Sequence, residues 1–558
     1  MAVTAKIISS LEKCFIGTDV DKLSEYKSAT ALRGERVSFQ IALRETDLSA
    51  GHRRLLKIAV SGDLGCDISV RRVGHVPVRF PTYPSVAALG DDYICTEPGL
   101  YPDPLFPMKS GELVSAAYGQ TDSFWFTFDV PADAEAGDHT VKVILQNYDS
   151  GETVVEKSLT VHVVGAALPK SDMIVTQWFH CDSLAHYYDT EAFSEKHWKI
   201  IENFIRTAAD NGINAILTPV FTPPLDTKVG GERMTMQLVD VCKNGEEYSF
   251  GFDKLERWIN VCLGCGVEYF EISHFFTQWG AAHAPKVVAY VDGKSEPEKI
   301  FGWETDACGA EYTAFLRSFL KAFIPFMKER GLDGKCLYHI SDEPSMAHLE
   351  AYKNAKATIA DLLEDYKIID ALSNYEFYQT GAIANPVPAN NHIQPFIDNN
   401  VPDLWTYYCC SQNYKVSNRF IAMPSSRNRV IGIQMYKFAI VGFLQWGYNF
   451  YETWLSMRSI DPYQVNDGDF WVPAGDAFSV YPALDGTAVE SLRLDVFRDA
   501  LQDISAMKLC EKLIGREKTV KLIEEESDRP ITFSEYPAGA DFVLRVREKI
   551  NRAIEENI

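Results

Sequence analysis

The chain has 558 residues, of which 46% are hydrophobic and 23% are charged, and its formal net charge is −23 at pH 7. This length predicts two or more domains with a large core, and the composition is typical of a soluble globular protein. The negative charge argues against nucleic acid or an anionic membrane surface as the main partner, because either would favour a basic patch. No apolar run in the sequence is long enough to span a membrane.

Residues 1–17 carry charges and lack the uninterrupted apolar stretch of a signal peptide. This pattern predicts a cytoplasmic protein, or a secreted one whose leader has been trimmed. The twelve cysteines are scattered and favour a reducing compartment. One CxxC, formed by Cys262 and Cys265, has no second pair at zinc-ribbon spacing and lies among apolar neighbours, which favours a helix core over a metal site. We therefore expect neither a metal nor another cofactor.

The first 168 residues carry strand signals. Runs of alternating, aromatic or β-branched residues, separated by turn clusters, cover residues 36–43, 122–129, 140–145 and 154–164. Many short strands with such punctuation predict an N-terminal β-sandwich domain over residues 1–168. The segment Pro169-Lys170-Ser171 marks the expected domain boundary.

Beyond this boundary, strand and helix signals alternate. The expected strands cover residues 173–179, 213–218, 267–274, 335–341, 367–372, 403–408, 419–423 and 442–446. The expected helices cover residues 195–210, 253–264, 309–329, 345–365, 427–441 and 489–513. Roughly eight such units favour a (β/α)8 TIM barrel over residues 169–514 rather than an open doubly wound sheet. A short C-terminal helical tail follows over residues 515–558, with its terminal helix expected at 541–556.

The expected strand at 335–341 leads into two adjacent carboxylates, Asp342 and Glu343, and then Pro344. Consecutive strand side chains point to opposite faces, so both carboxylates can act together only if the backbone leaves regular β geometry there. Two close carboxyls repel, which raises the pKa of one and suits acid/base chemistry. The local sequence equally allows a structural interpretation, in which these residues cap the helix expected from Ser345.

Aromatic, amide, imidazole and carboxylate side chains recur near the expected carboxyl ends of the barrel strands, where TIM-barrel sites lie. A single tryptophan or histidine at such a place is more often structural. Together, these side chains are typical of a carbohydrate site, because sugar C–H faces stack on rings and sugar hydroxyls need hydrogen bonds. The candidate substrate-binding residues are Trp178, His180, Asp182, Asn214, His274, Trp405, Tyr407, Trp446 and Asn449.

Four motifs of this chain resemble those of glycoside hydrolase family 123. They are the segments 178–182 (WFHCD), 341–344 (SDEP), 442–449 (GFLQWGYN) and, near the end, Asp485-Gly486 followed by 491–495. The resemblance covers residues 172–514 well and the N-terminal region loosely. It implies an N-terminal β-sandwich, a (β/α)8 barrel and retaining, exo-acting β-N-acetylgalactosaminidase activity on a glycan or glycoside with a terminal β-N-acetylhexosamine.

The same resemblance implies substrate-assisted catalysis, with Glu343 as general acid/base and Asp342 orienting and polarising the substrate 2-acetamido group. An ordinary retaining glycosidase needs a nucleophilic carboxylate about 5–5.5 Å from the acid, on the other side of the sugar. Consecutive Cα atoms are only about 3.8 Å apart, which makes that placement awkward. Burial and the nearby Asp342 are expected to raise the pKa of Glu343, as a general acid requires.

Two alternatives stay open at this point. One is a glycosidase with a protein nucleophile, in which Glu343 is the acid and Glu271 or Glu452 lies opposite. The other is a non-catalytic carbohydrate-binding protein, in which Asp342 and Glu343 only cap a helix. The choice between N-acetylgalactosamine and N-acetylglucosamine also stays open, because no residue visibly reads the axial O4 hydroxyl.

Overall fold

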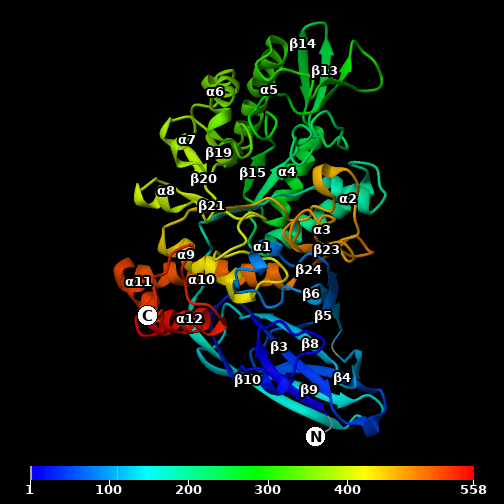
Figure 1. Cartoon of the computed structure of the whole chain (residues 1–558), viewed down its shortest axis with the longest axis vertical. Coiled ribbons are helices and arrows are strands. Elements are labelled where there is room, and N and C mark those ends of the chain that lie inside the picture. The colour runs from blue at the N-terminus through cyan, green and yellow to red at the C-terminus, as the bar shows by residue number, and fades with distance from the viewer. Residues whose placement is uncertain (1–2, 110) are drawn as a thin grey trace.

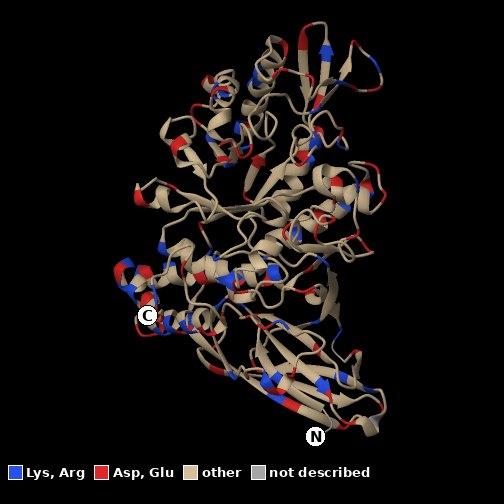
Figure 2. Cartoon of the chain, viewed as in Figure 1, with Lys and Arg blue, Asp and Glu red and all other residues tan. Residues whose placement is uncertain are grey.

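The computed structural model describes residues 3–109 and 111–558 of the chain. The molecule is elongated, with the N-terminal sheets at one end and a barrel of strands and helices above them (Figure 1). Within the described residues, no helix has both the length and the apolar character needed to cross a bilayer. Lysine and arginine are interspersed with aspartate and glutamate along the whole length of the molecule (Figure 2).

The N-terminal region is built from two five-stranded sheets. The first sheet is antiparallel and runs in the order β1 (Val3–Ser9), β3 (Arg36–Glu45), β8 (Thr121–Asp129), β5 (Ser69–Val78) and β6 (Gly99–Met108). The second runs in the order β2 (Ser28–Arg33), β10 (Thr153–Ala167), β9 (Gly137–Asn147), β4 (Arg53–Gly62) and β7 (Leu113–Ala117). Apolar residues of both sheets share one core, in which Phe39 and Phe126 stack as a cross-strand pair with ring centroids 5.0 Å apart.

The next region is a nearly closed barrel of eight parallel strands, consistent with a TIM barrel. Each strand except β20 pairs with the next along the chain, and the last also pairs with the first. A single bridge between Ala389 and Tyr407 joins the two strands that lack a ladder. The strands are β11 (Ile174–Gln177), β12 (Ala215–Thr218), β15 (Tyr269–Ile272), β18 (Cys336–Tyr338), β19 (Lys367–Ala371), β20 (Asn385–Val387), β21 (Trp405–Tyr407) and β22 (Gly442–Gln445).

Helices cover the outside of the barrel, and α3 illustrates why they form (Figure 1). The Ser194 hydroxyl caps α3 by accepting a hydrogen bond from the His197 amide, and buried Ile201, Phe204 and Ile205 recur at helical spacing. The barrel helices are α2 (Cys181–Tyr187), α3 (Glu195–Asp210), α4 (Asp253–Cys265), α5 (Ala310–Glu329), α6 (Leu349–Ala357), α7 (Tyr375–Gln379), α8 (Gln394–Asp398), α9 (Ser425–Lys437) and α10 (Leu492–Ile514).

Two strand assignments in the sixth and seventh units differ from the sequence prediction. Residues 419–423 form no strand, because Arg419 is buried there and donates to the side chains of Gln177 and Gln445. The sixth strand is instead β20, which has only three residues and contains Pro386. A proline removes one ladder donor and weakens the strand signal, so the sequence alone did not reveal this element.

The remaining elements lie outside the barrel proper. Two loops after β12 and β15 supply a four-stranded sheet that packs beside α5, and α12 packs against β10 and β2 of the N-terminal region. These elements are α1 (Pro84–Ala87), β13 (Asp240–Asn244), β14 (Glu247–Gly251), β16 (Val287–Val291), β17 (Glu298–Phe301), β23 (Val480–Pro482), β24 (Ala488–Glu490), α11 (Arg516–Glu524) and α12 (Ala540–Glu555).

Candidate active site

A cavity of about 210 Å³ opens where the barrel strands end. Five of the sequence-predicted site residues line it: Trp178 after β11, Asp342 and Glu343 after β18, Tyr407 at the end of β21 and Trp446 after β22. The remaining wall comes mainly from loops. These loops contribute Asp226, Gln278, Trp279, Cys409, Cys410, Ser411, Trp454 and Trp471.

The backbone after β18 brings both consecutive carboxylates to this cavity. Strand β18 ends at Tyr338, and Glu343 has a φ of 44°, in the left-handed region that non-glycine residues seldom adopt. The Asp342 carbonyl accepts a hydrogen bond from the Trp279 amide at 2.9 Å, and the Ser341 hydroxyl donates to the Thr277 carbonyl at 2.9 Å. Strained conformations of this kind concentrate at functional sites.

The helical segment that follows uses a different cap. Ser345 and His348 form a reciprocal capping box at its N-terminus. Glu343 is instead held from across the barrel, because the Tyr407 hydroxyl donates to its Oε1 at 2.5 Å. The Tyr407 hydroxyl also lies 3.3 Å from the Ser373 hydroxyl. The N-terminus of this helical segment is therefore capped by Ser345 and His348, and not by Asp342 or Glu343.

Three carboxylates share the cavity, and the charge of Glu343 makes the ionisation of Asp342 and of Asp226 more costly. Burial and then the charge of Glu343 raise the pKa of Asp342 well above its usual range, with a smaller effect in the same direction from Asp226. Burial raises the pKa of Asp226 to about 6, although the Arg233 guanidinium opposes this shift. The site thus disfavours the ionised forms of Asp342 and Asp226.

Indole rings form much of the cavity surface. The Trp178 indole N–H donates to Glu271 at 2.8 Å, and the Trp446 indole N–H donates to Asp476 at 3.0 Å, so the orientation of both rings is fixed. Trp279 and Trp454 are 45% and 52% exposed. Large rings exposed beside a carboxylate cluster suit the apolar face of a sugar.

A buried chain of hydrogen bonds supports this surface from below. The His339 imidazole lies between Glu271, at 2.7 Å, and Asp370, at 3.2 Å, and all three side chains are fully buried. Asp370 also accepts from the Ile340 amide at 3.1 Å and from the Tyr352 hydroxyl at 2.6 Å. These contacts fix both the Trp178 partner Glu271 and the chain segment that leads to Asp342.

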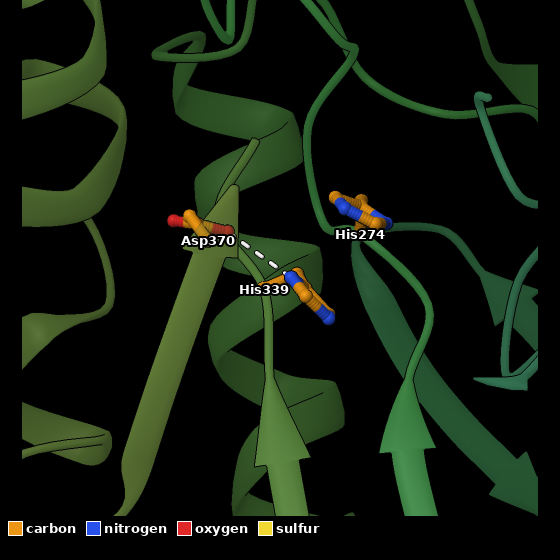
Figure 3. A group of neighbouring side chains, drawn as sticks. All are labelled: His274, His339 and Asp370. Carbon is orange, nitrogen blue, oxygen red and sulfur yellow. Dashed lines mark hydrogen bonds and ion pairs between the residues drawn. The ribbon is translucent and has the colours of Figure 1, made fainter. Parts of the chain in front are cut away.

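His274, His339 and Asp370 lie close enough together to be considered as metal ligands, with donor atoms within 4.8 Å of one another (Figure 3). However, hydrogen bonds to the two carboxylates outweigh the effect of burial and raise the pKa of His339 to about 9. His274 stacks on the His339 ring at 4.2 Å, and burial together with the His339 charge lowers the pKa of His274. His339 and Asp370 thus form a buried ion pair, while both ring nitrogens of His274 are buried without a hydrogen-bond partner among the described residues.

Two predicted site residues lie at the opposite end of the barrel. Asn214 precedes β12, and its amide group bonds the Val175 amide and the Met173 carbonyl at 2.8 and 3.0 Å. Trp405 begins β21 and is fully buried in the barrel interior. Both strands were correctly located, but Asn214 lies just before its strand and Trp405 at the start of its strand, rather than at the carboxyl end, so their placement at the site is corrected.

Four other predicted residues are buried and do not line the cavity. His274 belongs to the buried cluster of Figure 3. The Asn449 side chain bonds both backbone groups of His180. The His180 ring contacts the Trp446 carbonyl at 2.9 Å, and Asp182 pairs with Arg233 at 2.5 Å. The latter three residues support the Trp446 wall and, through an Arg233 bond to the Leu225 carbonyl, the loop that carries Asp226.

The two glutamates considered as nucleophiles are also buried and occupied. Glu271 is fully buried and accepts hydrogen bonds from Thr176, Trp178 and His339. Glu452 is 1% exposed and pairs with His186 at 2.6 Å. Neither side chain lines the cavity.

Sequence reasoning missed the loop residues of the cavity, above all Asp226, Trp279, Trp454 and Trp471. They lie outside any strand, in loops where period-based reasoning finds no pattern. The available signal was the presence of tryptophans in polar loop segments, since an exposed tryptophan outside a core is a functional hint.

Three comparisons with known proteins bear on this site. The model of the glycoside hydrolase 123 catalytic domain matches residues 178–510. A solved family 123 glycoside hydrolase from Clostridium perfringens, described for glycolipid glycan hydrolysis, superposes with a TM-score of 0.73. It is 17% identical, and the match covers 99% of this chain and 98% of that one. No curated protein matches this chain.

Two further structural matches cover only small parts of this chain. A β-glucosidase from Listeria innocua has a TM-score of 0.15 at 12% identity, over 30% of this chain and 16% of that one. A protein from Corynebacterium diphtheriae described as membrane anchored has a TM-score of 0.17 at 11% identity, over 30% and 37% of the two chains. Such low scores carry no functional argument.

Proposed function

Because this chain belongs to glycoside hydrolase family 123, we propose that it releases terminal β-N-acetylgalactosamine from glycans. In this proposal the enzyme is exo-acting and retaining, and the substrate 2-acetamido group serves as the nucleophile. The observation that carries the proposal is the pair of consecutive carboxylates, Asp342 and Glu343, lining one cavity with several indole rings. The substrate is a glycan or glycoside with a terminal β-N-acetylhexosamine, and glycolipid glycans are the natural class to test first.

In the proposed reaction, Glu343 protonates the leaving oxygen and then removes a proton from the attacking water. The Tyr407 hydroxyl binds one oxygen of Glu343, which leaves the other oxygen for proton transfer. Asp342 accepts the acetamido N–H and stabilises the positive charge of the oxazolinium-like intermediate. The raised pKa of Asp342 means that substrate binding has to favour its ionised form, which the developing positive charge does.

The surroundings of the carboxylates support substrate assistance over a protein nucleophile. Glu271 and Glu452, the glutamates first considered as nucleophiles, are both buried and engaged by other side chains. Attack by the substrate amide oxygen needs no second carboxylate across the sugar ring. The indole of Trp178, held by Glu271, offers a flat surface for the sugar to which that amide is attached.

A second candidate mechanism rests on Asp226. This residue lines the same cavity, and its pKa responds to the charge of Glu343. A retaining glycosidase acting on sugars without an acetamido group could use Asp226 as nucleophile and Glu343 as acid. The two mechanisms differ in whether the substrate needs its 2-acetamido group.

The test is a panel of 4-nitrophenyl β-glycosides of N-acetylgalactosamine, N-acetylglucosamine and galactose. We expect hydrolysis of the N-acetylgalactosaminide, little hydrolysis of the galactoside, and competitive inhibition by a thiazoline mimic of the cyclic intermediate. Rapid hydrolysis of the galactoside with labelling of Asp226 by a 2-fluoro galactoside would favour the second mechanism. Binding of N-acetylgalactosamine without turnover of any substrate would reject both catalytic proposals.

We also propose that the chain divides at residues 168 and 514 into a β-sandwich domain, a catalytic barrel and a C-terminal extension. The shared core of the two N-terminal sheets supports the first division. Helix α12 of the extension packs against β2 and β10, which suggests that it braces the N-terminal domain. Limited proteolysis with mass mapping tests these boundaries, and a first cut inside β10 or α10 would contradict them.

A further inference from the structure

Two free cysteines, Cys409 and Cys410, lie side by side in the wall of the cavity, immediately after β21. Consecutive Cα atoms are about 3.8 Å apart, so both sulfurs are close to each other whenever both side chains face one space. Both side chains are partly exposed and line the cavity together with Glu343 and Tyr407. Nothing in the proposed glycoside hydrolysis uses a thiol.

Hydrogen bonds from neighbouring side chains fix the backbone around these cysteines. The Gln412 side chain accepts from the Cys409 amide at 2.9 Å and from its thiol at 3.2 Å, and Asn418 donates to the Cys409 carbonyl at 2.8 Å. Tyr407, two residues earlier, donates to Glu343. The thiols are thus presented from a fixed loop, and a group attached to them would lie in the space that a sugar needs.

The Cys409 thiol on its own is a poor nucleophile. An interaction with the Cys410 thiol, together with burial, raises the pKa of Cys409 well above its usual range. Alkylating agents that need a thiolate should therefore react slowly with Cys409. A soft, two-coordinate acceptor is different, because it gains two sulfur bonds at once from a preformed pair.

We propose that Cys409 and Cys410 form a chelating site for soft, thiophilic metal and metalloid ions, and that occupation of this site blocks the cavity. For a trivalent arsenical oxide the step is balanced: R–As=O and two thiols give R–As(S)₂ and one water. Two S–H bonds break and two As–S bonds form, while both protons leave with the oxide oxygen. Arsenic stays trivalent, so no oxidant or reductant is needed.

The probe is phenylarsine oxide, and the first measurement is intact mass under native conditions, which does not depend on any enzymatic activity. We expect one phenylarsenic group per wild-type chain, removed by 2,3-dimercaptopropanol but not by an equal concentration of monothiol. Subsequent alkylation and peptide mapping of the wild type should find the peptide with Cys409 and Cys410 protected. Protection of a different cysteine pair would overturn the proposal.

Cysteine variants show whether arsenic binds to Cys409 and Cys410 or to another close pair of cysteines. Cys262 and Cys265 face each other across one turn of α4, so Cys265→Ser is the matched control and should still bind arsenic. Cys409→Ser and Cys410→Ser should each lose the label, because chelation needs two thiols. Retained labelling in both, or loss in Cys265→Ser, would reject the assignment.

The activity measurement then tests whether arsenic bound to the two thiols blocks the cavity. Each protein's hydrolysis rate is compared with its own untreated rate, so any direct effect of a substitution cancels. Wild type and Cys265→Ser should lose more than about tenfold in rate on stoichiometric labelling, and the Cys409 and Cys410 variants should lose less than about twofold. Full labelling without loss of activity would show a binding site that leaves the cavity open and would overturn the blocking.

Discussion

Asp342 and Glu343 are neighbours in the chain, yet their surroundings differ. Asp342 is partly buried, and its pKa is raised by burial and by the Glu343 charge. Glu343 is exposed to the cavity and receives a hydrogen bond from Tyr407. These differences suit the two tasks proposed above, for Asp342 the stabilisation of a cationic intermediate and for Glu343 the transfer of a proton.

The first prediction separates these tasks by the acidity of the leaving group. Glu343→Gln should nearly abolish hydrolysis of N-acetylgalactosaminides with poor leaving groups and spare those with good ones, because only the former need protonation. Asp342→Asn should lose about 10²–10³ in rate, equivalent to about 2.7–4 kcal/mol, whatever the leaving group. The measurement is kcat/KM on aryl glycosides of graded phenol pKa. Parallel losses for both variants across the series would contradict the division of roles.

The second prediction concerns stability and pH. The pKa of Asp342 is raised in the folded state, so its favourable contribution to stability is present below its unfolded pKa of about 3.8 and is lost as the pH rises through the folded value. Asp342→Asn should therefore match the wild type near pH 3.5 and show a higher Tm at pH 7.

Asp182 provides a control of opposite sign. Burial raises its pKa, but the charge and hydrogen bonds of Arg233 outweigh burial and lower it overall. Its contribution to stability is therefore present above the unfolded pKa, and Asp182→Asn should lower the Tm at pH 7. Thermal unfolding from pH 3.5 to 8 measures both variants, and a lower Tm for Asp342→Asn at pH 7 would show that the buried carboxylate is not a net cost.

At the scale of elements, helices α9 and α10 approach each other closely at Gly432. A Cβ atom added there would lie 2.4 Å from the Ala500 carbonyl oxygen, which belongs to the backbone and cannot rotate away. Gly264, near the end of α4, is also helical, but a Cβ atom added there would meet nothing within 4 Å. Substitution of Gly264 by alanine therefore tests helix propensity alone, whereas substitution of Gly432 also tests helix packing.

The third prediction uses this pair. Gly264→Ala should stabilise the protein by about 0.5–1 kcal/mol, because alanine loses less backbone entropy than glycine on folding. Gly432→Ala should destabilise it by about 1–3 kcal/mol, because overpacking forces the two helices apart. Urea denaturation measures both changes, and equal stabilisation by both substitutions would show that the helices can separate without cost.

The sequence located most barrel elements because their signals are local. Helix α3 spans residues 195–210 as predicted, since its apolar stripe and its serine cap lie within one segment. Short strands were harder. The strands expected around Asn214 and Trp405 were found, but a shift of a few residues along a four-residue or three-residue strand moves a side chain to the other end of the barrel.

At the scale of the whole molecule, buried ion pairs join the N-terminal sheets to the barrel. Arg493 of α10 forms a bidentate pair with Asp103 of β6, at 2.8 and 2.9 Å, and neither side chain is more than 1% exposed. The Tyr481 hydroxyl donates to the same carboxylate at 2.6 Å. Such a pair is costly to break, because the remaining charge stays buried.

The fourth prediction follows from that cost. Asp103→Asn should destabilise the protein by about 3–5 kcal/mol, since it leaves the Arg493 guanidinium without a counter-charge. The control is Asp122→Asn, which removes a surface pair with the 49% exposed Arg72 and should cost about 0–1 kcal/mol. Urea unfolding measures the stability of both variants. Separate unfolding of the N-terminal region and the barrel gives a second signal. Similar small effects for the two variants would show that the interface does not depend on the buried pair.

The sequence by itself determined the order of most barrel elements, the carboxylate pair and the family resemblance, because these depend on neighbouring residues. Tertiary structure alone decided which side chains share the cavity. Glu343 reaches it through a left-handed backbone and a tyrosine 64 residues away, while Asp226 and Trp454 reach it from distant loops. Such meetings depend on how the strands close into a barrel, and no local pattern of residues encodes that closure.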